Sequence, residues 1–234
     1  SGHDSDMAGG RRWRDAGDLD LPDDPADAAA EIRTAAAGFV ASGEPIVAIG
    51  GDHFVTWPLV AALGESQVVR PLTILHVDAH PDLYDHLDGE RLSHACPFAR
   101  IMEAGAADRL VQFGIRTMNA HQREQADRFG VEVHTAADWD GHLPAVEGDV
   151  YVTIDVDGID PAFAPGVSHH EPGGLTSRQV IGLIHQLAEN PSIRLVGADV
   201  VEINPRRDVH DMTAALGAKL VKELLGAFAE HAAR

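Results

Sequence analysis

Two apolar stretches of this chain end in side chains that commonly bind metal ions, and this feature limits the possible folds more than any other. The stretch TIDVDGIDP at 153–161 presents Asp155 and Asp157, and the stretch HVDAHPD at 76–82 presents Asp78, His80 and Asp82. Each apolar run is predicted as a buried strand, on which side chains two residues apart point the same way. Burying so many unpaired carboxylates is costly, and divalent cations usually relieve that cost. We therefore predict a hydrolase with two metal ions.

The strands of this chain are predicted to alternate with helices. Apolar runs predicted as strands lie at 45–49, 72–77, 110–115, 131–134, 150–154 and 194–201. Segments predicted as helices lie at 25–43, 56–63, 98–106, 121–129, 177–188 and 212–231, and the first of them keeps one apolar face at helical spacing. Alternation of this kind, with strands apolar on both faces, is typical of an α/β fold with a parallel central sheet between two layers of helices. The sequence therefore predicts a three-layer α/β/α architecture.

Polar side chains follow four of the predicted strands. His53, Asp78, Asp155 and Glu202 all fall at or just after a strand end. In parallel sheets, ligands bind beyond the carboxyl ends of the strands. We therefore expect these four side chains to meet at one edge of the sheet and to form a single site.

The group Asp78, His80 and Asp82 is the most informative one. A mixture of carboxylates and imidazole suits manganese, iron, cobalt or zinc better than calcium or magnesium. The alternative is that the acids only cap the turn around Pro81. His53 follows Gly50 and Gly51, which would let the backbone approach a crowded metal site closely, although an ordinary turn explains that pattern too.

The pair Asp155 and Asp157 also has simpler interpretations. An Asp-Gly turn between strands would explain the segment without a metal. A calcium-binding loop is excluded, because Asp160 stands where that motif requires glycine. Two separate groups of ligands at strand ends favour the metal site over the turn.

Four residues are candidates for roles in catalysis or substrate binding. His94, in the loop SHACP at 93–97, is a candidate proton shuttle, since histidine titrates near neutral pH; an exposed loop histidine is the alternative. Glu202 is placed to pair with a planar cation such as guanidinium, or is a surface acid. Cys96 raises the possibility of a thiol nucleophile with His94 as its base, but the carboxylate groups would then have no role. His169 precedes the loop EPGGLT at 171–176 and is a candidate for the pocket mouth.

Length, composition, net charge and cysteine count exclude several classes of protein. A chain of 234 residues with 44% hydrophobic content is long enough for one domain, predicted over 1–234, in which 1–24 form a short polar N-terminal segment. The net charge of -19 argues against nucleic acid or an anionic membrane as a partner and is compatible with a cationic substrate. One cysteine excludes an internal disulfide framework. Since no signal peptide or membrane-spanning run is visible, we expect a cytoplasmic protein.

Six ordered motifs resemble those of the ureohydrolases, the arginase and agmatinase family. They are GGDH at 50–53, DAHPD at 78–82, SHA at 93–95, DVDGIDPAFAPG at 155–166, EPGGL at 171–175 and VEINP at 201–205. Within that family the chain is most similar to the plant-type arginases, which share Tyr84 after DAHPD and PGVSH before EPGG. The resemblance runs from about residue 45 to the C-terminus.

The resemblance implies an arginase-like fold that holds two manganese ions per chain. One ion would be held by His53, Asp78, Asp82 and Asp155, and the other by His80, Asp78, Asp155 and Asp157. Asp78 and Asp155 would bridge the ions, which would activate a shared hydroxide. That hydroxide would attack a guanidinium carbon and release urea and an amine.

The resemblance also implies roles for residues around the metals. Glu202 would orient the guanidinium, Asp82 would steer the nucleophile, His94 would handle protons and His169 would line the pocket. L-arginine is the expected substrate, with agmatine or another guanidino compound as the alternative and a non-catalytic binding protein as a more distant one. The family also implies homo-oligomers, either trimers or hexamers.

Two features depart from the family pattern. The usual N-terminal strand is not visible in the first 24 residues, although the segment from Asp15 to Leu19 resembles a later part of that region. Animal arginases have asparagine where Tyr84 stands, and that asparagine helps to hold the substrate carboxylate. The preference for arginine is therefore expected from overall similarity and not from a visible carboxylate clamp.

Overall fold

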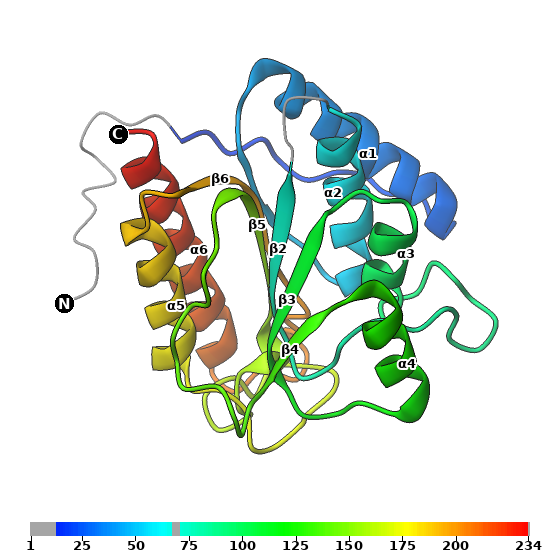
Figure 1. Cartoon of the computed structure of the whole chain (residues 1–234), viewed down its shortest axis with the longest axis vertical. Helices are drawn as coiled ribbons and strands as arrows, with labels where there is room; N and C mark the ends of the chain where they lie inside the picture. The colour runs from blue at the N-terminus through cyan, green and yellow to red at the C-terminus, as the bar shows by residue number, and fades with distance from the viewer. Residues whose placement is uncertain (1–12, 67–70, 234) are drawn as a thin grey trace.

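A computed structural model describes residues 13–66 and 71–233 and shows one parallel sheet between two layers of helices (Figure 1). The six strands lie in the order β1-β6-β5-β2-β3-β4, and every neighbouring pair is parallel. The strands are β1 (Ile46–Ile49), β2 (Leu72–Val77), β3 (Arg109–Ile115), β4 (Glu132–Thr135), β5 (Gly148–Asp155) and β6 (Ile193–Val201). The predicted three-layer α/β/α fold is confirmed.

Six α-helices and two short 3-10 helices complete the described chain. The helices are α1 (Pro25–Ser42), α2 (Thr56–Glu65), α3 (Pro97–Glu103), α4 (Ala120–Phe129), α5 (Ser177–Glu189) and α6 (Met212–His231). The 3-10 helices are η1 (His53–Val55) and η2 (Val156–Gly158). Each agrees with a segment predicted from the sequence to within a few residues, apart from the 3-10 turns, which the sequence did not predict.

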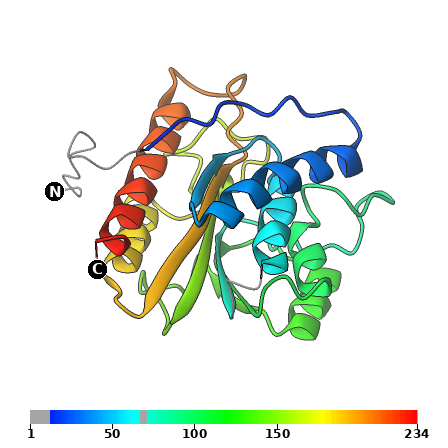
Figure 2. The same ribbon diagram turned by 90° about the horizontal axis from the view of Figure 1, so that it is seen from above.

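The two faces of the sheet pack against different helices, as Figure 2 shows from above. On β2, Leu72 and Ile74 belong to a core shared with α1, α2 and α3, whereas Leu75 and Val77 belong to the core beneath α5 and α6. All four are fully buried, and burying each such side chain contributes about 1.5–3 kcal/mol. Because successive side chains of a strand point to opposite faces, an uninterrupted apolar run is what a central strand covered on both sides requires.

Local signals in the sequence fix where the first helix begins and ends. Asp24 accepts hydrogen bonds from the backbone N–H groups of Ala26 and Asp27, and Pro25 occupies the first helical position. Gly43 ends the helix in the left-handed conformation, at φ 72°. The predicted helix over 25–43 is therefore confirmed.

The N-terminal segment before α1 differs from the rest of the chain. Residues 13–24 contain neither helix nor strand, and Arg14 forms an ion pair with Glu44. The predictions that concern residues 1–12 lie outside the described residues. Among the described residues, no helix combines the length and the hydropathy that crossing a membrane requires.

The strand order contains a point at which the chain changes direction. From β2 the chain proceeds through β3 to β4 at one edge, whereas β5 returns to the other side of β2 and leads on to β6. A crevice opens beyond the carboxyl ends of the two strands at such a switch point, here β2 and β5. The strands that end in the two predicted groups of metal ligands are therefore direct neighbours.

Candidate metal centre

All six side chains predicted to bind metal lie at the carboxyl edge of the sheet. His53 begins η1, just after β1; Asp78, His80 and Asp82 follow β2; Asp155 ends β5 and Asp157 lies in η2. Gly158 allows this arrangement, since a Cβ at that position would lie 2.7 Å from the backbone nitrogen of Asp78. The turn after β5 can therefore rest directly on the end of β2.

Three carboxylates converge on one nitrogen of His53. Its Nδ1 lies 3.1 Å from Oδ2 of Asp78, 3.1 Å from Oδ2 of Asp82 and 3.2 Å from Oδ2 of Asp155. All four residues are buried, and His53 Nδ1 has no hydrogen-bond partner of acceptable geometry. Three oxygens and one unpaired nitrogen around a single point are the arrangement that a bound cation requires.

A second group of candidate ligands lies around the other carboxylate oxygen of Asp78, Oδ1. Nδ1 of His80 lies 3.4 Å from Oδ1 of Asp78 and 3.2 Å from Oδ2 of Asp157. Asp78 thus faces both histidines, one with each oxygen. The other oxygen of Asp155, Oδ1, accepts the backbone N–H of Asp157 at 2.8 Å, which holds this carboxylate beside Asp157.

The electrostatics of the carboxylates also fit a cation. Burial, and after it the charge of Asp78, raises the pKa of Asp82 to about 7. Burial and the charges of Asp157 and Asp78 raise the pKa of Asp155 well above its usual range. Crowded buried acids resist ionisation unless positive charge is close. The residues present therefore fit a pair of divalent ions, and the mixture of imidazole and carboxylate suits manganese or another first-row transition metal.

Two residues of the site adopt the left-handed backbone conformation, which is unusual outside glycine. Asp82 has φ 48° and Glu202 has φ 64°. Each such residue costs on the order of 1–3 kcal/mol, and strain of this kind is concentrated at functional sites. The fold therefore holds these two carboxylates in place at the expense of stability.

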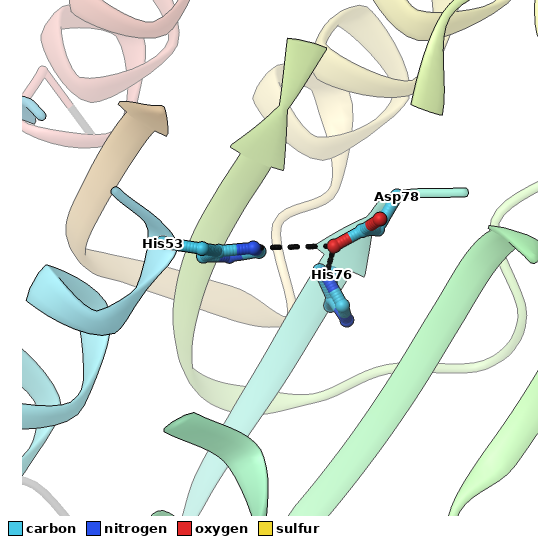
Figure 3. Close-up of side chains that lie close together, drawn as sticks. All are labelled: His53, His76 and Asp78. Carbon is cyan, nitrogen blue, oxygen red and sulfur yellow. Dashed lines mark hydrogen bonds and ion pairs between the residues drawn. The ribbon is translucent and has the colours of Figure 1, made fainter. Parts of the chain in front are cut away.

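His76 is a site residue that the sequence analysis missed. Its Nε2 lies 2.7 Å from Oδ2 of Asp78 (Figure 3). Its ring stacks on Phe98 with centroids 4.0 Å apart. The amide Nε2 of Gln112 lies 3.0 Å from His76 Nδ1, and burial lowers the pKa of His76 to about 4. A neutral His76 therefore accepts from Gln112 and donates to Asp78. The signal was its position two residues before Asp78 on the same strand.

Arg116 was missed as well, although it directly follows the predicted strand that ends at 115. Its guanidinium donates to the backbone carbonyl oxygens of Asp157 at 2.7 Å, Gly158 at 3.0 Å and Glu171 at 2.6 Å. It also donates to Gly114 at 3.1 Å. Arg116 therefore fastens the turn that carries Asp157 to the loop that begins at Glu171.

The remaining predicted residues line a hollow of about 530 Å³ beside the ligands. Glu202 lies in it, and its Oε1 accepts the backbone N–H of His53 at 3.0 Å. The rings of His94 and His169 also line it and stack on each other with centroids 5.4 Å apart. The ring of His169 lies 6.1 Å from that of His80, so the hollow borders the predicted metal ligands.

Three other features of the molecule do not contribute to the candidate metal centre. Cys96 is fully buried, burial raises the pKa of its thiol, and it is absent from the lining of the hollow, so the geometry gives no support to a thiol nucleophile. His170 binds the carbonyl oxygen of Pro165 at 2.8 Å and belongs to the scaffold. A larger hollow of about 820 Å³ lies near the amino ends of the strands and contains none of the predicted site residues.

Comparisons with known proteins agree with this geometry. The sequence model of the Arginase family matches residues 3–226. The chain is 51% identical over 189 residues to Arginase 1, mitochondrial, of Arabidopsis thaliana, covering 77% of this chain and 54% of that protein. It is 35% identical over 219 residues to an agmatinase of Bacillus anthracis, covering 92% of this chain and 74% of that protein.

A solved structure shows the same fold. The arginase from Medicago truncatula superposes with a TM-score of 0.77 at 41% identity, covering 88% of this chain and 66% of that one. The chain spans about half the length of the Arabidopsis arginase that it matches.

Proposed function

The chain belongs to the arginase family, and we propose on that premise that it hydrolyses a guanidino group to urea and an amine, with L-arginine as substrate. The observation that carries the proposal is the convergence of His53 and His80 on one carboxylate, Asp78, among further buried acids. One carboxylate placed between two histidines supports a site for two metal ions, as hydrolases of this kind use. Two relatives that this chain resembles in sequence are named arginase and agmatinase.

The proposed mechanism assigns each residue a task at the carboxyl edge of the sheet. Two manganese ions, held by the six predicted ligands, would supply Lewis acidity and lower the pKa of a water molecule. Glu202 offers a carboxylate to the planar guanidinium, and its hydrogen bond from the His53 backbone holds that carboxylate still. Asp82 steers the attacking oxygen.

Breakage of the carbon–nitrogen bond leaves an amine that needs a proton. His94 is the proposed proton donor, and its position supports the proposal: it lines the hollow, is partly exposed, and its Nδ1 lies 3.9 Å from Asp52 Oδ2. His169 forms the wall between His94 and His80. The residues of this chain thus bind, orient and protonate the substrate.

Arginine ranks ahead of agmatine for two reasons. The identity to the Arabidopsis arginase, 51%, exceeds that to the Bacillus agmatinase, 35%. Arg206 also lines the hollow, and its guanidinium forms no ion pair or hydrogen bond with the described residues, so it is available to a substrate carboxylate. Agmatine lacks that carboxylate. Agmatine is nevertheless the second candidate, because the match to the Bacillus agmatinase covers 92% of this chain.

The direct experiment measures urea release from L-arginine and from agmatine by the manganese-loaded protein, with metal content determined in the same sample. We expect kcat/KM to be higher for arginine. Turnover of agmatine alone would contradict the arginase assignment. Two bound ions without turnover of any guanidino compound would instead favour the non-catalytic binding protein.

Several further properties are proposed for this chain. Manganese is the proposed resident metal, the assembly a homo-oligomer of three or six chains, and 1–234 a single domain. We keep the cytoplasm as the proposed location, although the Arabidopsis relative is named as mitochondrial. Metal analysis of the protein as isolated, light scattering and cell fractionation test these proposals.

A further inference from the structure

A buried carboxylate that the proposed reaction does not use, Asp199, is connected through one threonine to His53. We propose that Tyr151, Asp199 and Thr153 form a hydrogen-bonded relay that holds His53 in the tautomer whose Nδ1 is free to bind a cation. This inference deepens the proposed function and rests on it only for the identity of that cation.

The contacts of the relay are short and fully enclosed. Asp199 Oδ1 accepts from Thr153 Oγ1 at 2.6 Å, and Oδ2 accepts from the Tyr151 hydroxyl at 2.7 Å and from Thr56 Oγ1 at 2.9 Å. Asp199, Thr153 and Thr56 are 0% exposed and Tyr151 is 2% exposed. On its other side, Thr153 Oγ1 lies 3.0 Å from His53 Nε2. The relay therefore ends on the nitrogen opposite the three carboxylates.

Two features of the backbone bring these side chains together. The pairing of β5 with β6 shifts between Val150 and Tyr151, so that Thr153 lies beside Asp199 on the same face of the sheet. Gly197, the partner of Tyr151, leaves room for the phenol ring, since a Cβ there would lie 2.7 Å from that ring. An irregular register and a glycine are thus both used to assemble the relay.

The direction of the hydrogen bonds follows from the chemistry of the groups. A threonine hydroxyl has one hydrogen to donate, and a contact of 2.6 Å is typical of donation to an ionised carboxylate. Burial raises the pKa of Asp199, and the hydrogen bonds from the three hydroxyls oppose that shift. Since Thr153 donates to Asp199, it can only accept from His53, so Nε2 carries the hydrogen, and in the neutral ring Nδ1 keeps its lone pair. A histidine binds metal through such an unprotonated nitrogen.

Substitutions that reverse or remove the relay test the proposal. In Asp199→Asn, an amide facing Thr153 would donate instead of accept, so that the threonine donates to His53 and the hydrogen moves to Nδ1. Thr153→Val removes the acceptor altogether, whereas Thr153→Ser keeps it. We expect the first two variants to lower manganese affinity at one of the two sites by about 10–100-fold, as loss of a partner behind a metal ligand typically does. Thr153→Ser, which keeps the hydroxyl, should bind manganese with the affinity of the wild-type protein.

The readouts separate a positioning role from a merely structural one. Calorimetric titration of metal-depleted protein with manganese gives affinity and stoichiometry. Long-range ¹H–¹⁵N spectra of the metal-free protein, recorded at a pH where the His53 ring is neutral, give the tautomer of His53. Thr73→Val makes the same change in a buried residue of β2 that does not contact the relay, and it should alter neither readout. If Thr153→Val does not fold, Thr153→Ala replaces it.

Unchanged affinity and an unchanged Nε2–H tautomer in folded Thr153→Val and Asp199→Asn would overturn the relay. The tautomer measurement requires no metal, so it tests the relay even if the wild-type protein takes up no manganese. A wild-type protein that takes up no manganese would count against the proposed function and not against the relay.

Discussion

The contact between Gly158 and the end of β2 leads to a quantitative prediction. A Cβ at position 158 would lie 2.7 Å from the backbone nitrogen of Asp78 and 2.8 Å from its Cα. Both atoms belong to the backbone directly after the central strand β2 and cannot rotate away. In Gly158→Ala the turn η2 therefore has to move by about 0.7 Å to reach ordinary contact at 3.4 Å, which carries Asp157 away from His80.

The size of the effect follows from that displacement. Overpacking of this kind destabilises a protein by about 1–3 kcal/mol. At about 2–4 °C per kcal/mol for a chain of this size, the melting temperature of the metal-free protein should fall by about 2–12 °C. Because a misplacement of about 1 Å costs on the order of 100-fold in rate, we expect kcat/KM for arginine to fall by about 10–100-fold.

The assay combines thermal unfolding without metal, manganese titration and steady-state urea release. The matched control is Gly182→Ala on α5, where a Cβ would meet no atom within 4 Å. Alanine is the better helix former, so this variant should gain about 0.5–1 kcal/mol and keep its activity. A Gly158→Ala protein with wild-type melting temperature and wild-type manganese affinity would refute the argument that this turn must touch β2.

Three further predictions address the hollow, the metal and the cysteine. Arg206→Gln should raise KM for L-arginine by about three- to tenfold and leave KM for agmatine unchanged, because a charge-assisted contact at an exposed site is worth about 1 kcal/mol; equal changes for both substrates would contradict this role. Saturating manganese at about 100 times its Kd should stabilise the folded protein by about 2.7 kcal/mol over chelator-treated protein, measured as a rise in melting temperature, whereas no rise would argue against a built metal site. Cys96→Ala should retain full turnover in the urea assay, and loss of turnover in a variant that still binds manganese would revive the thiol mechanism.

The sequence was sufficient to predict most of the secondary structure and the layer arrangement. Apolar runs on both faces of the strands, a proline at the start of α1 and a glycine at its end are local signals that the structure uses directly. The candidate ligands were visible for the same reason, since Asp155 and Asp157 or Asp78 and His80 lie close in sequence at a strand end. Such patterns depend on the chain within a few residues, so a sequence shows them.

Relations between distant segments were decided only by the tertiary structure. His53 and Glu202 are 149 residues apart and share a hydrogen bond, and Asp199 reaches Thr153 only because the register of β6 shifts by one residue beside β5. The helical segment at 156–158 and the support of Asp78 by His76 also escaped prediction. The sequence by itself determined which side chains end each strand. The order and register of the strands, which arise from packing summed over the whole sheet, decided which of those side chains meet.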